Sequence, residues 1–369
     1  MKKFFTFLAA ATVLVAFASC SKEEPTITLP DYGTHGALIL AEGNIGKTNS
    51  SLAFVDNEGN LSREVFKTAN NEELGGVAQS ITKHDNKLWI VLNGSNCIKV
   101  VNPKTWKQEG VIEGLQSPRY IHFVSPTKAY VTQMYTDKIA IISTESMSVI
   151  GSITVKPLEE FSTKFDPMGM SSEKMIQVGS TVYVNCWTGT KLLLGIDTAT
   201  DKIVKQMEVG VQPCDMAVDN EENIWVITDG GGDWTAEGVG QETPAIHKVN
   251  LTTWTKEDYG LNPEWGWHLA FDKVNDRLYI SSGMSVKYIN TKDVKFKTIE
   301  EKKVLETSNF ADDIKAAYSI AVNPDNQEVW VGDALDYSQS GKMHIFDKGG
   351  NKQKVIDNVG IIPGFIMWK

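Results

Sequence analysis

Apolar and polar residues alternate in short runs along most of the chain, with the period of two that is typical of β-strands. One run recurs, with an aromatic residue between apolar or β-branched neighbours and a turn after it. Six copies centre on Trp89, Tyr130, Tyr183, Trp225, Tyr279 and Trp330, and a weaker copy covers residues 37–41. The aromatic positions lie 41 to 54 residues apart. Four short strands per ~50 residues is the spacing of a β-propeller blade.

A second set of apolar runs gives an independent count of the blades. These runs are the candidates for the innermost strand of each blade and cover residues 77–81, 119–123, 173–177, 214–218, 266–270, 317–321 and 364–368. The last run lies at the C-terminus, whereas the run at 37–41 has no inner partner before it. We expect these two to share one blade, because joining them closes the ring and removes exposed strand edges.

These patterns predict an all-β fold. Residues 36–369 are expected to form one seven-bladed β-propeller, closed by N- and C-terminal strands that share one blade. The aromatic residue of each second strand is expected to pack between neighbouring blades.

The N-terminal segment predicts a lipoprotein signal peptide over residues 1–19. Lys2 and Lys3 precede an apolar stretch over residues 6–19 that is too short to cross a bilayer. Small residues before Cys20 resemble a lipobox, although Phe17 stands where a smaller aliphatic residue is usual. We expect Cys20 to be lipidated and residues 20–35 to form a tether. The alternative is an ordinary secretory signal in which the cysteine occurs by chance.

The composition indicates a globular protein and argues against a nucleic-acid partner. Hydrophobic residues make up 41% of the chain, as in ordinary globular proteins, and the net charge is −10. An acidic chain has no basic surface for a phosphate backbone, so we expect no nucleic-acid partner. Besides Cys20 the chain has three cysteines, Cys97, Cys186 and Cys214, so at least one thiol is free. Their apolar neighbours in the sequence favour burial.

The candidate binding site lies in two sets of loops that a propeller places on one face. These loops run from the outer strand to the next inner strand and from the second strand to the third. Aromatic and amide side chains are frequent in them, which suits a large amphipathic ligand. The candidate ligand-binding residues are Asn93, Arg119, Gln133, Tyr135, Asn185, Trp187, Asp229, Trp234, Trp265, Trp267, Asp336 and Tyr337. The alternative for each ring is that it only plugs the mouth of the channel.

Signals of catalysis or metal binding are scarce. The chain has no G-x-S-x-G, H-E-x-x-H or phosphate-binding loop motif, and no pair of histidines has metal-ligand spacing. We therefore expect neither an enzyme nor a metal site. The segment from Asp229 to Asp233 could hold calcium, but an ordinary loop is favoured, because the segment lacks the further spaced carboxylates of a dedicated calcium site. Among the histidines, His268 alone stands beside a candidate site residue on an expected inner strand.

Several loop phrases resemble the BtuG-type surface lipoproteins of Bacteroides. They include Ser-Pro-Arg-Tyr-Ile-His-Phe at 117–123, Tyr-Val-Asn-Cys-Trp at 183–187 and Val-Gly-Ile-Ile-Pro-Gly at 359–364. The resemblance extends from Leu38 to Lys369. It implies a seven-bladed propeller that captures cobalamin at the cell surface and passes it to a BtuB-type TonB-dependent transporter. A lipid anchor in the outer membrane, facing outward, is implied as well.

Chemistry is consistent with this resemblance. Cobalamin presents an apolar corrin plane, amide arms and a phosphate. Rings such as Trp187 can cover the corrin, the amides of Asn93, Gln133 and Asn185 can pair with the arms, and Arg119 can meet the phosphate. Two other classes of function remain open. One is a surface adhesion module that binds glycan or protein, and the other is a propeller enzyme of the lactonase or quinoprotein type.

Overall fold

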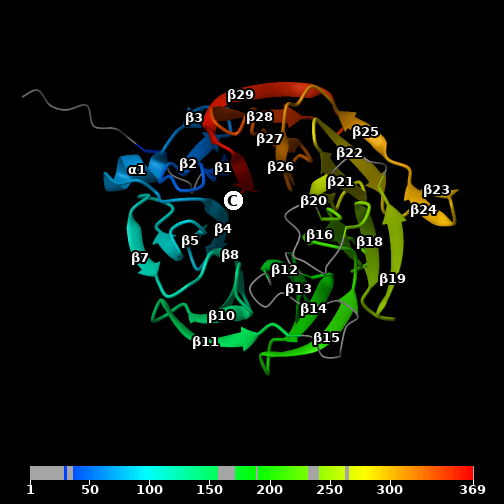
Figure 1. The fold of residues 1–369 in the computed structure, drawn as a ribbon. Coiled ribbons are helices and arrows are strands. Elements are labelled where there is room, and N and C mark those ends of the chain that lie inside the picture. Colours follow the sequence, from blue (N-terminus) through cyan, green and yellow to red (C-terminus); the bar gives the residue numbers. More distant parts are fainter. Residues whose placement is uncertain are drawn as a thin grey trace, which may run out of the picture.

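The computed structural model describes residues 29–30, 36–156, 171–187, 190–231, 241–261 and 266–368. Within these ranges the strands form seven sheets, which Figure 1 shows arranged in a ring around a central axis. We number the sheets as blades 1 to 7 along the chain. The predicted all-β, seven-bladed propeller is confirmed.

Blades 1 to 4 each contain four antiparallel strands, named in order from the inside of the ring outward. Blade 1 contains β30 (Pro363–Trp368), β1 (Gly36–Ala41), β2 (Ser51–Asp56) and β3 (Leu61–Ser62). Blade 2 contains β4 (Ala78–His84), β5 (Lys87–Leu92), β6 (Cys97–Val101) and β7 (Gln108–Ile112). Blade 3 contains β8 (Pro118–Phe123), β9 (Lys128–Gln133), β10 (Lys138–Ser143) and β11 (Ser148–Thr154). Blade 4 contains β12 (Ser172–Val178), β13 (Thr181–Cys186), β14 (Leu192–Asp197) and β15 (Lys202–Glu208).

Blades 5 to 7 follow the same order, with one extension. Blade 5 contains β16 (Pro213–Val218), β17 (Ile224–Thr228), β18 (Ala245–Asn250) and β19 (Thr255–Gly260), beyond which lie β24 (Lys302–Leu305) and β23 (Phe296–Ile299). Blade 6 contains β20 (Gly266–Asp272), β21 (Arg277–Ser282), β22 (Ser285–Asn290) and β25 (Ser308–Ala311). Blade 7 contains β26 (Ala317–Val322), β27 (Val329–Asp333), β28 (Ser340–Phe346) and β29 (Lys352–Ile361).

Blade 1 joins the two ends of the described chain. The C-terminal β30 pairs antiparallel with β1, and Ile39 lies opposite Ile366. The β30 strand also contacts β4 of blade 2 and β26 of blade 7. Closure by shared N- and C-terminal strands is therefore confirmed, and β30 is the inner neighbour of β1.

The innermost strands form a continuous ring of neighbours. Each contacts the inner strand of the next blade, in the order β30, β4, β8, β12, β16, β20 and β26, and Figure 1 shows them around the central axis. All seven runs predicted as inner strands occupy these positions. The propeller thus places the second residue of each inner strand at a common level around the axis.

The hydrophobic core lies between neighbouring blades, where the repeated aromatic residues pack. Trp89 of blade 2 packs with Ile121 and Val131 of blade 3. Tyr130 of blade 3 likewise packs with Val182 of blade 4. All six repeated aromatics are buried, as predicted. Burying a large ring in such a seam stabilises the fold by about 2–3 kcal/mol.

Two features depart from a plain repeat. The short helix α1 (Val65–Asn70) was not predicted; its buried Val65 and Phe66 pack against blades 1 and 2. The β23–β24 hairpin adds two strands to the outside of blade 5, so that blade has more than the four strands expected. In the described ranges, no helix has the length and apolarity needed to cross a membrane.

Candidate functional site

The second residue of each inner strand stands at a repeated irregularity. In every blade the pairing with the second strand shifts register just after the first residue of the inner strand, as where Ala78 faces Leu92 but Ser80 faces Val91. A β-bulge of this kind turns a side chain away from its regular direction. We call these seven positions the ring residues: Gln79, Arg119, Glu173, Cys214, Trp267, Tyr318 and Gly364.

Six of the ring residues line one cavity on the axis of the propeller, and the exception is Gly364. The cavity has a volume of about 360 Å³, within the range of small-molecule sites. Trp187, which follows β13, and Tyr337, in the loop after β27, also line it. Both lie in connections between second and third strands, so the cavity opens on the face that the sequence predicted.

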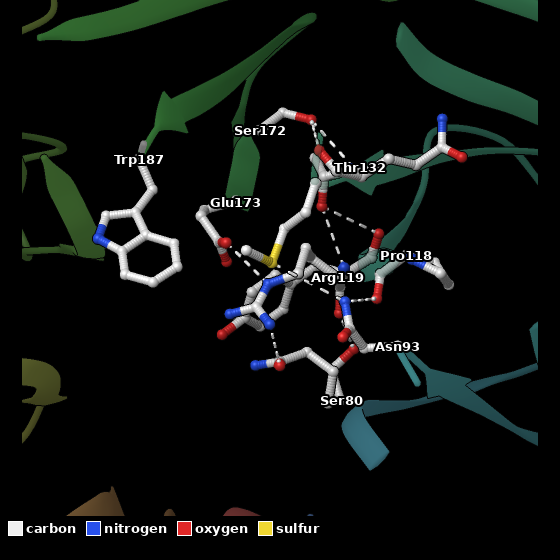
Figure 2. Close-up of polar contacts among 12 residues, drawn as sticks. Ser80, Asn93, Pro118, Arg119, Thr132, Ser172, Glu173 and Trp187 are labelled. Atoms are coloured by element: carbon white, nitrogen blue, oxygen red, sulfur yellow. Dashed lines mark hydrogen bonds and ion pairs between the residues drawn. The ribbon is translucent and has the colours of Figure 1, made fainter. Parts of the chain in front are cut away.

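Arg119 is the central cation of the cavity. Its Nε donates to Glu173 Oε1 at 2.7 Å, and its Nη1 donates to Gln79 Oε1. Figure 2 shows Arg119 beside Glu173, with the Trp187 indole nearby; the guanidinium carbon lies 5.8 Å from the indole centroid. These contacts connect the inner strands of blades 2, 3 and 4. Burial raises the pKa of Glu173, although Arg119 opposes that shift.

Glu42 occupies the position that the seventh ring residue leaves open. Gly364 has no side chain, and a Cβ there would lie 2.7 Å from Glu42 Oε1. Glu42 follows β1, lines the same cavity and accepts a hydrogen bond from the Tyr318 hydroxyl at 3.0 Å. Burial raises the pKa of Glu42, while Arg119 and Tyr318 oppose the shift. The small residue at 364 therefore lets a carboxylate approach the axis.

A second polar cluster lies on the opposite side of the ring from Gln79. Asp215 Oδ1 accepts from Lys174 Nζ at 2.5 Å, and Asp215 Oδ2 lies 3.3 Å from His268 Nδ1. The three residues come from the inner strands of blades 4, 5 and 6. Burial opposes ionisation of Asp215, but Lys174 and His268 outweigh it and hold its pKa at about 2. The carboxylate is therefore ionised at neutral pH.

Exposed apolar side chains stand on the loops of the same face. Tyr135 is 57% exposed and Tyr337 is 48% exposed. Ile45, after β1, and Met284, after β21, are also largely exposed. All four lie in connections between second and third strands. These four side chains are the candidates for contact with a partner on this face.

The structure brings four predicted site residues together at the cavity: Arg119, Trp187, Trp267 and Tyr337. Tyr135 lies on the same face but does not line the cavity. Asp336 is exposed, and its carboxylate accepts the backbone N–H groups of Ser338 and Gln339. Trp234, Trp265 and Cys20 lie outside the described residues.

The predicted amide residues have partners inside the protein, and two of them connect neighbouring blades. Asn93 Nδ2 donates to the carbonyl of Pro118 at 3.3 Å, and Asn185 Nδ2 donates to the carbonyl of Pro213. Both prolines begin the inner strand of the next blade. Gln133 accepts from the Gln116 N–H at 2.7 Å and donates to the Lys138 carbonyl at 2.9 Å. These amides have internal partners that a ligand would have to replace.

Asp229 supports Trp187. Its buried carboxylate accepts from the indole Nε1 of Trp187 at 3.1 Å and from the Gly231 N–H at 2.8 Å. Burial raises the pKa of Asp229, and these two hydrogen bonds oppose the shift. Asp233, the far end of the candidate calcium loop, lies outside the described residues. Within the described ranges, no group of three or more His, Cys, Asp or Glu side chains is placed to hold a metal ion.

Sequence reasoning missed several polar residues of the cavity, namely Glu42, Gln79, Glu173 and Tyr318. The predicted site was built mainly from loops, whereas Gln79, Glu173 and Tyr318 lie inside inner strands. A usable signal was present, because Gln79, Glu173 and Tyr318 lie within recognised inner runs and Glu42 directly follows the first strand. The free thiols are confirmed: Cys97 and Cys186 are buried, and Cys214 lines the cavity.

Comparison with solved structures shows the propeller fold. A quinoprotein alcohol dehydrogenase-like protein from Bacteroides thetaiotaomicron aligns with a TM-score of 0.61 and 12% identity, over 92% of this chain and 79% of that one. A provisionally named 6-phosphogluconolactonase from Bacteroides uniformis aligns with a TM-score of 0.63 and 9% identity, over 91% and 99%. Hydrazine synthase from Kuenenia stuttgartiensis aligns with a TM-score of 0.53 and 16% identity, over 73% and 76%. At such identities the likeness concerns the fold alone.

Comparison of the sequence shows the family. No curated protein matches the chain significantly. A family model described as a domain of unknown function, DUF5074, matches residues 35–357, which is most of the chain and nearly the whole propeller. The chain therefore belongs to the DUF5074 family.

Proposed function

We propose that this protein binds cobalamin over the mouth of the axial cavity, with part of the ligand reaching into it, and does so without transforming it. The observation that carries the proposal is the mixed lining of the cavity, in which Trp187, Trp267 and Tyr318 stand among the charges of Arg119 and Glu173. Aromatic faces suit an apolar corrin plane, and polar groups suit its amide arms. The sequence resemblance to BtuG-type lipoproteins supports the choice of ligand.

Preorganisation of the ring favours tight binding. Arg119, Glu173 and Asp215 are fixed by contacts that cross from blade to blade, so binding would cost little side-chain ordering. Arg119 uses Nε and Nη1 inside the protein. We propose that the rest of its guanidinium fork offers donors to a ligand phosphate or amide oxygen.

The proposed setting is the outer surface of the outer membrane. The signal-like segment and Cys20 support a lipid anchor, and the exposed Ile45, Tyr135, Met284 and Tyr337 suit contact with a BtuB-type transporter that receives the vitamin. Cys20→Ala should release the protein from the membrane fraction. Protease added to intact cells should remove the wild-type protein, and full protection would contradict outward exposure.

The direct test is retention of cyanocobalamin. The purified protein is mixed with the vitamin and desalted, and we expect the protein fraction to keep the absorbance of cobalamin. A protein that releases all of the vitamin would refute the proposal. A glycan array and a protein-binding screen would then test the adhesion function.

Variants of Trp187 test whether its ring contacts the ligand. Trp187→Ala should weaken cyanocobalamin binding by roughly 30- to 1000-fold, the equivalent of ~2–4 kcal/mol at an interface hot spot. Trp187→Phe keeps a ring but loses the hydrogen bond to Asp229 and should weaken binding less. Phe296→Ala, on the exposed outer strand β23, is the matched aromatic control and should bind normally. Wild-type affinity in Trp187→Ala, measured by calorimetry, would move the site elsewhere.

A further inference from the structure

His268 presents a side chain to the cavity from the third position of β20. It lines the cavity beside the ring residue Trp267, and its ring centroid lies 6.0 Å from that of Tyr318. Its Nδ1 lies 3.3 Å from the buried Asp215 Oδ2. Among the described residues, the structure gives Nδ1 this partner and gives Nε2 none. The imidazole is thus held at one nitrogen only.

Asp215 fixes which nitrogen carries the proton. Its carboxylate also accepts the N–H groups of Met216 at 2.6 Å and Leu269 at 2.9 Å, and it pairs with Lys174. An ionised carboxylate accepts hydrogen bonds but donates none, so His268 Nδ1 must be the donor. In the neutral imidazole the lone pair is then on Nε2.

This arrangement is the one found around metal-binding histidines. Such a histidine generally donates its other ring N–H to a carboxylate or carbonyl, which fixes the ring and raises its basicity. Among the described residues, no group of three or more His, Cys, Asp or Glu side chains is placed to hold a metal ion, so none is built around His268. A metal approaching His268 would therefore have to bring most of its ligands with it, as the cobalt of a corrinoid does.

We propose that His268 Nε2 coordinates the cobalt of a bound corrinoid on its exchangeable upper face. The proposal rests on cobalamin binding at this cavity. The step is a ligand exchange: the bond from cobalt(III) to water in aquocobalamin breaks, a bond from cobalt to Nε2 forms, and the water leaves. No electron is transferred. Cyanocobalamin, whose upper cyanide is held firmly, would bind through the cavity walls alone.

The experiment compares aquocobalamin with cyanocobalamin on the full-length wild-type protein. We expect aquocobalamin to show shifted visible absorption bands on binding, because nitrogen replaces oxygen on cobalt. We expect its release to be at least ~10-fold slower than that of cyanocobalamin. Bands of cyanocobalamin should keep the positions of a cobalt that retains its cyanide.

Variants separate coordination from general binding. His268→Gln should abolish the band shift with aquocobalamin, and the two forms of the vitamin should then be released at similar rates. His122→Gln is the matched control; His122 lies on the inner strand β8, where its Nε2 already contacts Gln177 Oε1 at 2.9 Å. That variant should keep the shift. A band shift that persists in His268→Gln would overturn the proposal.

A second measurement needs no variant. With ¹⁵N-labelled histidine in the wild-type protein, aquocobalamin should move one ring-nitrogen resonance strongly, and cyanocobalamin should not. Retention of cyanocobalamin without any aquocobalamin shift would refute coordination by His268 and leave the proposed function standing. Failure to retain either form would refute both.

Discussion

Two positions of the repeated blade behave in opposite ways. On the second strand, all six repeated aromatic residues are buried. Trp330 is slightly more exposed than the other five, which are Trp89, Tyr130, Tyr183, Trp225 and Tyr279. On the inner strand, the ring position instead holds an amide, a guanidinium, a carboxylate, a thiol, two aromatic rings and a glycine. The second-strand position holds an aromatic ring in six of the seven blades, and the inner-strand position changes its chemistry in nearly every blade.

The physical demands on the two positions explain the difference. A second-strand residue must fill the seam to the next blade, and similar seams need large apolar side chains, which are rings in six of the seven blades. A ring residue faces the axis, where side chains of different blades meet. Its stability comes from specific partners, as Arg119 has in Glu173 and Gln79. Varied chemistry at such positions gives the cavity the asymmetry that recognition of one ligand requires.

Removing residues 364–369 should have the largest effect, because it affects both positions at once. It deletes most of β30, the inner strand of blade 1, and exposes the edge of β1. We expect loss of the cooperative thermal transition or aggregation on purification. Removing only Lys369 is the control. A truncated protein that melts like the full chain would show that blade 1 does not close the ring.

Trp89→Ala tests the uniform position by itself. The variant leaves a cavity in the seam between blades 2 and 3 and should lower the free energy of unfolding by about 3–5 kcal/mol. Cobalamin affinity should be nearly unchanged in protein that remains folded. Chemical denaturation and calorimetry measure the two quantities. A large loss of affinity at full stability would reverse the roles of the two positions.

Glu173→Leu tests the pairing of ring residues. It leaves Arg119 buried without its carboxylate and should cost about 3 kcal/mol of unfolding free energy. The double variant Arg119→Met with Glu173→Leu removes both charges and should recover most of that loss. Arg119→Met alone completes the comparison. If the losses of unfolding free energy in the two single variants add up to the loss in the double variant, the contact contributes little.

Asp215 predicts a dependence of stability on pH. Its pKa is about 2 in the folded protein and near 3.8 as an ordinary side chain, so its ionised form favours folding. That contribution, about 2 kcal/mol, is complete above pH 5 and is lost as the pH falls towards 2. The stability difference between the wild-type protein and Asp215→Asn should shrink over this range. A constant difference in acid denaturation would contradict the assignment.

Tyr337→Ala should have the smallest effect on stability. The ring is half exposed and meets Tyr318 edge-on at 5.9 Å, so the free energy of unfolding should change by no more than ~0.5 kcal/mol. Cyanocobalamin affinity should nevertheless fall ~10-fold, since the ring lines the mouth of the cavity. Equal affinity for the variant and the wild-type protein would remove Tyr337 from the site.

Sequence patterns alone determined the number of blades, the inner strands, the buried aromatics and the closure by both ends. Each of these depends on alternation within a strand or on recurrence along the chain, which are visible in one dimension. Four candidate residues also proved to share one cavity. The hydrogen-bond partners of Asn93 and Asn185 were not foreseen, because these partners are carbonyls of the neighbouring blade.

Only the tertiary structure decided which side chains meet at the axis. Arg119 and Glu173 are 54 residues apart, and Tyr318 and Glu42 are 276 apart. Each pair comes from different blades and meets because the ring closes. The side chain of Glu42 reaches the axis because Gly364, at the other end of the chain, has no Cβ to exclude it. The sequence by itself determines the blades because strand formation is local, while the cavity depends on contacts between blades that no local pattern records.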